Sequence, residues 1–392
     1  MKICLICSEY PPFPHGGIGT FTQVFARGLV EAGHEVRVVG TVPHGTNIAM
    51  KENDQGVQVW RLPAPRSRYG WPLARLQLWR TVAKWARCGA IDLVEAPDWE
   101  GPTGFWPKLP VPVVIRVHGS VSYFQRELGR AVQRSIFNLE RSAFRRADAW
   151  CSVSRYTGEK TKEVFGLQHG PNAILYNPVE TSDVAVPTSR ANGRVVFSGT
   201  LTFKKGIVSL IRAWTDVIAA CPSAELHVYG KDGRTDDRTS MLEYLKSLLP
   251  KDASAFFHGH VTRQELFEVL QSARVAVFPS YAEAFAVAPL EAMTQGCPTI
   301  YSQRGSGPEL IDHGVDGLLV DPDQPLEIAR EIVRVLQDDE LASRLSTNGR
   351  QRVRQAFSLG RMLDQNLEFY CTCLEQFSDQ GQPSTSSQVI RV

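Results

Sequence analysis

The chain has 392 residues, of which 43% are hydrophobic and 21% are charged, a composition that is ordinary for a globular protein. It excludes a wholly disordered, collagenous or simple coiled-coil protein, and the length predicts two or three domains. The 43 basic and 41 acidic side chains leave a formal net charge of +2, which argues against a dedicated nucleic-acid-binding protein.

The charge is spread unevenly along the chain. The first 180 residues carry 22 basic and 15 acidic side chains, whereas the remaining residues carry 21 and 26. A basic first half would favour an anionic partner or a membrane surface. Chance variation of the surface composition explains the difference equally well.

Short apolar runs alternate with helical patterns through the first 180 residues, which predicts βαβ units and a parallel sheet. The expected strands are Ile3–Ile6, Val36–Val39, Val57–Leu62, Leu93–Glu95, Val113–Val117 and Ala149–Val153. The expected helices are Thr20–Ala32, Leu73–Arg87 and Phe124–Arg146.

The alternation is interrupted at 178–193, a stretch rich in Pro, Ser, Thr and Gly that is typical of a linker. It then resumes with expected strands at Arg194–Phe197, Leu226–Tyr229, Ala255–Phe257, Val275–Phe278, Thr299–Tyr301 and Leu318–Val320. The expected helices are Gly206–Ala219, Arg263–Gln271, Val287–Gln295 and Pro325–Leu336. Two such halves predict two doubly wound domains that face a cleft, with ligands beyond the carboxyl ends of the strands.

The C-terminal end is expected to be helical at 338–357 and 361–377, and the Ser/Gln-rich residues 378–392 predict disorder. Cys4 and Cys7 form a C-x-x-C inside a predicted strand, and no second pair has zinc spacing, so no metal site is expected. We interpret all eight cysteines as reduced. The N-terminus has no signal-peptide pattern, and no apolar run approaches the ~18 residues of a membrane span. A cytoplasmic protein is therefore expected.

Two glutamates flank the start of a predicted helix in the segment 278–293. Glu283 lies in the loop after the buried strand that ends at Phe278, and Glu291 lies eight residues further on, within the helix. Free amides at a helix start can bind an anion such as a diphosphate, and neighbouring carboxylates can bind sugar hydroxyls. Spacing alone favours the alternative, in which Glu283 is a charge favoured by the helix dipole and Glu291 belongs to a solvated face.

This segment resembles the E-x7-E motif of glycosyltransferase family 4, a family of retaining, nucleotide-sugar-dependent transferases. The following residues 296–300, Gly-Cys-Pro-Thr-Ile, also resemble that family, and the resemblance extends to about Phe357. It implies the α/β GT-B fold, with two Rossmann-like doubly wound parallel-sheet domains facing a cleft. The expected parts are an acceptor-side domain 1–180, a nucleotide-sugar-binding domain 181–357, a helix 358–377 that crosses back to the first domain, and a disordered tail 378–392.

The resemblance also assigns roles around the motif. Glu283 would contact hydroxyls of the donor sugar, and Glu291 would accept hydrogen bonds from the ribose. The family usually has glycine at the positions of Ala284 and Ala286, and alanine restricts both close approach and positive φ, which bears on the choice of donor. The backbone amides expected to face the sugar and phosphates are those of Phe285, Ala286 and Val287.

A second motif, at 198–206, follows the first strand of the second half. The family commonly has G-R-L-x-x-x-K-G there, in which the Arg and Lys neutralise the diphosphate. Lys205 matches the lysine, whereas the arginine position is Thr200, which removes a bidentate phosphate contact. Lys204 or Arg304 would be the compensating cation. The alternative is that the two lysines are solvated turn residues.

The first half contributes further candidates at the ends of its strands. Gly16 and Gly17 match the family's Gly-Gly loop, which approaches the donor phosphate and the acceptor; the alternative is an ordinary flexible loop. His118 follows a buried strand at a position that lies near the donor sugar in the family, and a structural role is as well supported. Glu95 and Asp98 are acceptor-side candidates only.

The resemblance thus implies a retaining, hexosyltransferase-type enzyme that moves a sugar from a nucleoside diphosphate sugar, UDP- or GDP-linked, to a hydroxyl acceptor. Its catalytic residues would be Glu283, Lys205 and His118, with no metal and no tightly bound cofactor. The acceptor would be a carbohydrate, a lipid-linked or a small-molecule alcohol in polysaccharide or glycoconjugate synthesis, and no nucleic acid is expected. The alternatives are an epimerase or phosphorylase on the same fold, or a sugar-nucleotide-binding protein with weakened catalysis.

Basic and aromatic side chains alternate between Arg66 and Arg87, where Trp71, Trp79 and Trp85 lie among six Lys and Arg residues. Such a helix can rest on anionic lipid, which would place the protein peripherally at the inner face of a membrane. The alternative, that the tryptophans pack in the core and the cations cover the outside, is favoured slightly.

Overall fold

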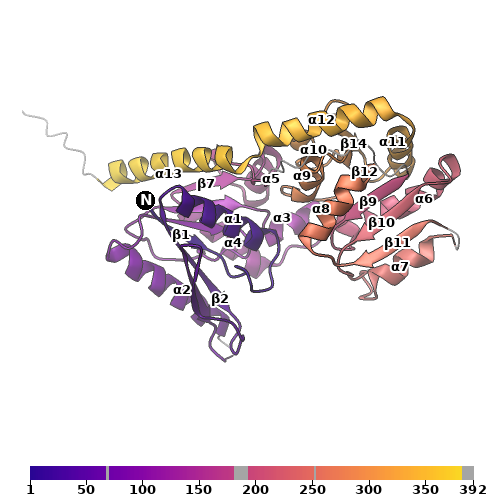
Figure 1. Ribbon diagram of the computed structural model, residues 1–392. Coiled ribbons are helices and arrows are strands. Elements are labelled where there is room, and N and C mark those ends of the chain that lie inside the picture. The colour runs from indigo at the N-terminus through magenta and orange to yellow at the C-terminus, as the bar shows by residue number, and fades with distance from the viewer. Residues whose placement is uncertain (68–69, 181–192, 251–252, 382–392) are drawn as a thin grey trace, which may run out of the picture.

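The computed structural model describes residues 1–67, 70–180, 193–250 and 253–381. The chain forms two α/β halves, each built on one sheet, and helices at the C-terminal end run along both (Figure 1). Most of the linker predicted at 178–193 and the predicted tail from 382 onward lie outside the described residues.

The first half contains an eight-stranded sheet in the order β3-β4-β2-β1-β5-β6-β7-β8, parallel except for β3 against β4. Its strands are β1 (Lys2–Ile6), β2 (Glu35–Val42), β3 (Lys51–Asp54), β4 (Val57–Pro63), β5 (Leu93–Pro97), β6 (Val113–Val117), β7 (Ala149–Ser152) and β8 (Ala173–Ile174). Its helices are α1 (Gly17–Glu31), α2 (Gly70–Arg87), α3 (Val121–Glu127), α4 (Arg134–Arg146) and α5 (Arg155–Phe165). All six predicted strands are confirmed.

Side chains of β1 alternate between two apolar cores, as the two-residue repeat of a strand requires. Ile3 and Leu5 pack in the core that also contains residues of α1, whereas Cys4 and Ile6 pack in the core that contains residues of α2. Cys7 belongs to the first of these cores, so the C-x-x-C pair points to opposite faces of the sheet. Both cysteines are free thiols whose pKa is raised by burial to about 12, and the spacing reflects strand packing.

The predicted helix Phe124–Arg146 is wrong, because the structure divides it into α3 and α4. The break lies at Gly129, whose φ of 64° is left-handed, a conformation that glycine adopts at little cost. The sequence analysis also missed β3, β8 and α5. β3 is a short polar edge strand, for which apolar periodicity gives no signal.

The second half contains a six-stranded parallel sheet in the order β11-β10-β9-β12-β13-β14. Its strands are β9 (Arg194–Ser198), β10 (Glu225–Tyr229), β11 (Ala255–Gly259), β12 (Val275–Phe278), β13 (Thr299–Ser302) and β14 (Leu318–Val320). Its helices are η1 (Phe203–Lys205), α6 (Ile207–Ala220), α7 (Met241–Leu248), α8 (Arg263–Ser272), α9 (Val287–Thr294), α10 (Gly307–Leu310), α11 (Pro325–Gln337) and α12 (Asp339–Ala356). The predicted strands are all present, and α7 was missed.

The chain crosses between the halves at two adjacent places. The amide of Val179 donates to the carbonyl of Phe357 at 2.8 Å, and Val179 bridges Ser358. Beyond this point α13 (Leu359–Gly381) packs on α1 of the first half (Figure 1). The tail predicted from 378 is wrong at its start, because Ser378 lies in α13 and its hydroxyl donates to the carbonyl of Leu374.

The exposed face of α2 carries Trp71, Leu73 and Leu76, whereas Trp79 and Trp85 are half-buried and pack towards the core. Two of the three tryptophans thus pack as the second interpretation expects, and the lipid-surface interpretation stays a prediction. Of the helices in the described ranges, none is both long and apolar enough to span a membrane.

The strand order reverses between β1 and β5 in the first sheet and between β9 and β12 in the second. Ligands of doubly wound sheets bind at such switch points, beyond the carboxyl ends of the strands. The loops after these four strands contain Gly16, Asp98, Lys205 and Glu283. The fold thus collects most of the predicted site residues at two facing edges.

Candidate active site

An ion pair between Lys205 and Glu283 lies at the switch point of the second sheet. The two side chains come from the loops after β9 and β12, which are neighbouring strands, and Lys205 Nζ lies 2.5 Å from Glu283 Oε1. The Glu283 side chain is only 10% exposed, whereas that of Lys205 is 32% exposed. The lysine is therefore open to a ligand on one side and fixed by the carboxylate on the other.

Opposing effects set the charge of this pair. Burial raises the pKa of Glu283, but the charges of Lys205 and Lys204 and a hydrogen bond from Ser280 outweigh it, so that the pKa lies below its usual value. Burial lowers the pKa of Lys204, with a smaller opposing effect from Glu283. The site holds an ionised carboxylate beside two clustered amines, an arrangement suited to binding an anion together with a hydroxylated group.

Gly206 fixes the geometry of this pair. Its φ is 71°, and a Cβ added there would lie 1.7 Å from the carbonyl oxygen of Pro279. The amide of Tyr281 also donates to the carbonyl of Lys204 at 2.8 Å. The lysine loop and the glutamate loop are thus packed backbone to backbone, which only glycine permits at residue 206.

The two alanines that replace family glycines adopt ordinary backbone conformations. Ala286 is the N-cap of α9 with φ −88° and has no side-chain cap, and neither Ala284 nor Ala286 is among the described residues with positive φ. The α9 amides remain the expected anion-binding end of the helix. The side chain of Phe285 packs against Tyr176 and Phe357, so only its backbone faces the donor side.

Glu291 is held by an arginine that also reaches the crossing segment. Arg263 Nε donates to Glu291 Oε1 at 3.0 Å, and the same guanidinium pairs with Glu180. Burial raises the pKa of Glu291, with Arg263 opposing, and its side chain is 18% exposed. This carboxylate is in place to accept hydrogen bonds from a ligand along α9.

The missing arginine of the second motif has no direct replacement in the described residues. Thr200 is exposed, and Arg304, one of the two compensating cations considered, is paired with Asp321 and Asp323. Lys204 instead reaches the other half, where its Nζ lies 3.7 Å from the centre of the Phe124 ring. Lys204 is thus a cation at the boundary between the two halves.

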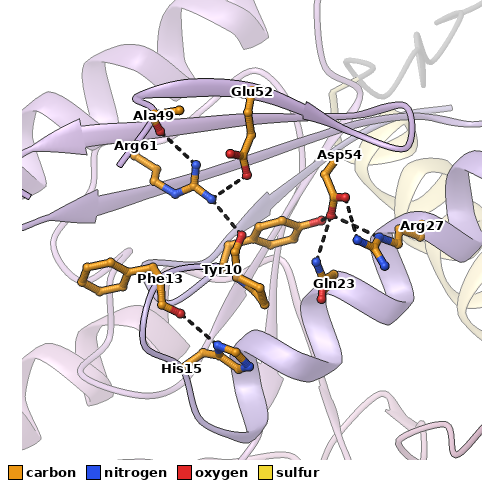
Figure 2. Close-up of polar contacts among 10 residues, drawn as sticks. Tyr10, Phe13, His15, Gln23, Arg27, Ala49, Glu52, Asp54 and Arg61 are labelled. Carbon is orange, nitrogen blue, oxygen red and sulfur yellow. Dashed lines mark hydrogen bonds and ion pairs between the residues drawn. The ribbon is translucent and has the colours of Figure 1, made fainter. Parts of the chain in front are cut away.

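The glycine loop of the first half is anchored by the β3–β4 hairpin (Figure 2). The Tyr10 hydroxyl donates to Asp54 at 2.8 Å, and Asp54 also accepts from Gln23 and Arg27. Arg61 donates to the carbonyl of Pro11 at 2.8 Å. The β3–β4 hairpin therefore fixes this loop, for which the sequence also allowed an ordinary flexible conformation.

Open space lies in front of this loop at its glycines. A Cβ added at Gly17 would meet nothing within 4 Å, and at Gly16 only the carboxylate of Glu9 at 3.7 Å. The same carboxylate accepts from the amide of Gly19 at 2.7 Å. A ligand can thus approach the start of α1, as the Gly-Gly expectation requires.

His118 and Asp98 lie together on the cleft side of the first sheet. The backbone amide of His118 donates to Asp98 Oδ1 at 2.8 Å, and the half-buried imidazole packs on the ring of Phe21. Burial, with a smaller effect of the Arg116 charge, lowers the pKa of His118 well below its usual range. The imidazole is neutral at physiological pH, able to accept or donate a hydrogen bond but not to act as a cation.

Asp98 is completely buried and supports His118, which argues against the expected contact with an acceptor. Burial raises its pKa from 3.8 to about 8. Between these values the folded protein retains a proton that the unfolded chain releases, so stability falls as the pH rises from about 4 to about 8, by at most about 1.4 kcal/mol per pH unit.

Asp98→Asn is expected to reduce this pH dependence, because the amide cannot ionise. The measurement is the urea unfolding midpoint at pH 5.5 and 8, with Asp236→Asn, an 81% exposed carboxylate, as the control. An Asp98→Asn variant that loses as much stability over this interval as the wild type would contradict the assignment.

Glu95, the other acceptor-side candidate, is also buried and paired within the protein, which argues against contact with an acceptor. Its carboxylate is 5% exposed and accepts two hydrogen bonds from Arg116, both at 2.8 Å. Tyr370 of α13 donates to it at 2.7 Å. The group binds the C-terminal helix to the first half.

Several contacts between the two halves could not be predicted from the sequence, because the residues that make them are far apart along the chain. Ser154 and Thr157, at the start of α5, both donate from their hydroxyls to the carbonyl of Ala284, at 2.9 and 2.8 Å. Glu309 accepts from the amides of Arg155 and Tyr156, at 2.7 and 2.8 Å. The first pair of contacts joins α5 to the loop that carries Glu283, and the second joins it to α10.

The two doubly wound domains, with an ion pair at one switch point and a glycine loop at the other, form the GT-B fold. The family model for Glycosyltransferase Family 4 matches residues 15–183, and that for Glycosyl transferases group 1 matches residues 185–352. The chain belongs to this family of glycosyltransferases.

Similar proteins match over nearly the whole chain. An uncharacterized glycosyltransferase of Methanocaldococcus jannaschii is 27% identical over 96% of this chain and 99% of its own length. A glycogen synthase of Mycobacterium tuberculosis is 25% identical, with 91% of each chain covered. Among solved structures, the sucrose-phosphate synthase of Thermosynechococcus elongatus has a TM-score of 0.78 at 20% identity, covering 96% of this chain and 99% of that one. Anabaena HepE, solved in complex with UDP-glucose, has a TM-score of 0.72 at 18% identity, covering 95% and 100%.

Proposed function

We propose that the protein transfers a hexose from a nucleoside diphosphate sugar to a hydroxyl acceptor, with retention of anomeric configuration. The observation that carries this proposal is the Lys205–Glu283 pair at the switch point, opposite the glycine loop of the first half. It places a cation and a carboxylate where a diphosphate and a sugar would meet.

The proposed chemistry assigns separate tasks to this pair. The departing diphosphate needs positive charge, which Lys205, Lys204 and the amides at the start of α9 supply. In the absence of donor, Lys205 pairs with Glu283, and the diphosphate would take over part of that pairing. Glu283 would then bind sugar hydroxyls, and Glu291 the ribose hydroxyls.

The first half would complete the site. The neutral imidazole of His118 would hydrogen-bond the donor sugar, and Gly16 and Gly17 would let the phosphates and the acceptor approach α1 closely. Water must be excluded, because it competes with the acceptor for the donor. The α5 contacts to Ala284 and Glu309 would hold the two halves together over the bound donor.

Relatives support the choice of donor class. HepE was solved with UDP and with UDP-glucose, and a trehalose-6-phosphate structure from E. coli was solved with UDP-2-fluoro glucose. We propose a UDP- or GDP-sugar as donor and a carbohydrate, lipid-linked or small-molecule alcohol as acceptor, in polysaccharide or glycoconjugate synthesis. Neither a resident metal nor a tightly bound cofactor is part of this proposal.

The test is a nucleotide-release screen with UDP-, GDP-, ADP- and dTDP-sugars, with and without pooled alcohol acceptors, and in parallel with EDTA. Consumption of one donor, stimulated by an acceptor and unaffected by EDTA, is the expected result. Isomerisation of the sugar without nucleotide release would favour an epimerase, and turnover only with inorganic phosphate a phosphorylase. Binding without turnover would contradict the proposed enzyme.

A further inference from the structure

The loop after β5 presents an indole to solvent on a fixed backbone. Trp99 is 42% exposed, although the residues on both sides of it are tightly held. Asp98 is buried, and the amide of Glu100 donates to the carboxylate of Glu140 at 3.1 Å. Arg75 of α2 donates to the carbonyls of Glu100 and Gly101. An ordered loop that keeps a large aromatic ring in water suggests a ligand for that ring.

Trp99 lies next to the active-site boundary. Its ring centre is 6.4 Å from that of Phe124. The Lys204 amine also contacts the Phe124 ring, with Nζ 3.7 Å from the ring centre. Lys204 in turn directly precedes Lys205, which pairs with Glu283. A continuous series of contacts therefore leads from the Glu283 carboxylate to Trp99 in the first half.

We propose that Trp99, backed by Phe124, is a platform that binds a sugar ring of the acceptor. This inference rests on the proposed function and deepens it, because it selects a carbohydrate among the possible acceptor classes. A pyranose has an apolar C–H face that can lie on the indole, while its hydroxyl edge remains available to polar groups of the cleft.

The surroundings favour a sugar over an acyl chain. Trp71 of α2 is also exposed, but the guanidinium of Arg75 lies 4.7 Å from the centre of its ring and separates it from the backbone next to Trp99. The apolar surface is thus interrupted by charge. An acyl chain needs a continuous apolar groove, whereas alternating apolar and polar surface matches the faces and edges of a sugar.

The experiment compares Trp99→Ala and Trp99→Phe with Trp71→Ala, a matched removal of an exposed indole outside the series of contacts. The probes are maltose, cellobiose, α-1,2-mannobiose and, as the lipid-like competitor, decanol. Each is assayed by saturation-transfer NMR and as an acceptor in nucleotide release. We expect at least one disaccharide to bind, with its affinity and its acceptor KM weakened about tenfold in Trp99→Ala. Trp99→Phe should restore most of the affinity, and Trp71→Ala should resemble the wild type.

Donor hydrolysis without acceptor separates this inference from the proposed function. It should be unchanged in Trp99→Ala, because the donor-binding residues are intact. The platform is overturned if Trp99→Ala binds every disaccharide as the wild type does, if no disaccharide binds, or if decanol alone loses affinity. It is overturned equally if donor hydrolysis falls in parallel with acceptor use. A wild type that hydrolyses no donor contradicts the proposed function itself, whatever the sugar-binding result.

Discussion

Replacing Glu283 with glutamine is expected to reduce sugar transfer by a factor of about 10² to 10³. Glutamine keeps the size of the side chain and one oxygen, but it removes the negative charge that pairs with Lys205. The pKa of Glu283 lies below its usual value, so the wild-type group is ionised throughout the neutral range. Loss of its charge should leave the donor sugar poorly oriented while the diphosphate is still bound.

The measurement is kcat and donor KM from nucleotide release, with Glu243→Gln as the control because the Glu243 side chain is 71% exposed and pairs with Lys246. We expect a large loss in kcat for Glu283→Gln and at most a small change in donor KM. Activity within threefold of the wild type would remove Glu283 from the proposed site.

Removing Arg116 is expected to cause the largest loss of stability, because it leaves Glu95 as a buried charge without its cation. Arg116 is fully buried against the rings of Phe21 and Phe25, and it also donates to Asn366 of α13. Breaking such a buried pair by removing one partner typically costs about 3–5 kcal/mol. Urea unfolding of Arg116→Met should show this loss.

The double variant Glu95→Leu/Arg116→Met provides the control. It strands no charge, so we expect it to be more stable than Arg116→Met alone. The account of this ion pair would be contradicted if Arg116→Met had the same urea unfolding midpoint as the wild type. It would also be contradicted if the double variant were no more stable than Arg116→Met.

The sequence predicted the elements that depend on local pattern. Apolar runs such as Val113–Val117 are buried strands, and the spacing of Lys205 and Glu283 after their strands brings them together because β9 and β12 are neighbours in the sheet. The motif resemblance therefore selected two side chains that the fold brings into contact. Its roles in donor binding stay predictions until a donor is tested.

Residues whose partners are distant in the sequence could not be assigned in this way. Glu95 ends the strand predicted at Leu93–Glu95, as a ligand-binding carboxylate would. Its contacts with Arg116 and with Tyr370, 275 residues away, show that it is part of the core. From the sequence alone, Lys204 could be interpreted as a solvated turn lysine. The fold shows that the Phe124 ring lies beside its amine. Tertiary contacts of this kind have no local periodicity or propensity that a sequence pattern could detect.

The most direct test of the central claim is a proton NMR time course of the wild type with the donor selected by the release screen and an acceptor that stimulates it. The account predicts that the anomeric signal of the donor is replaced by that of a glycoside with the same anomeric configuration, and that Glu283→Gln shows neither change. A product of opposite configuration would contradict the retaining mechanism. A donor that stays unconsumed beside a folded, donor-binding protein would contradict the assignment of this cleft as a transferase site.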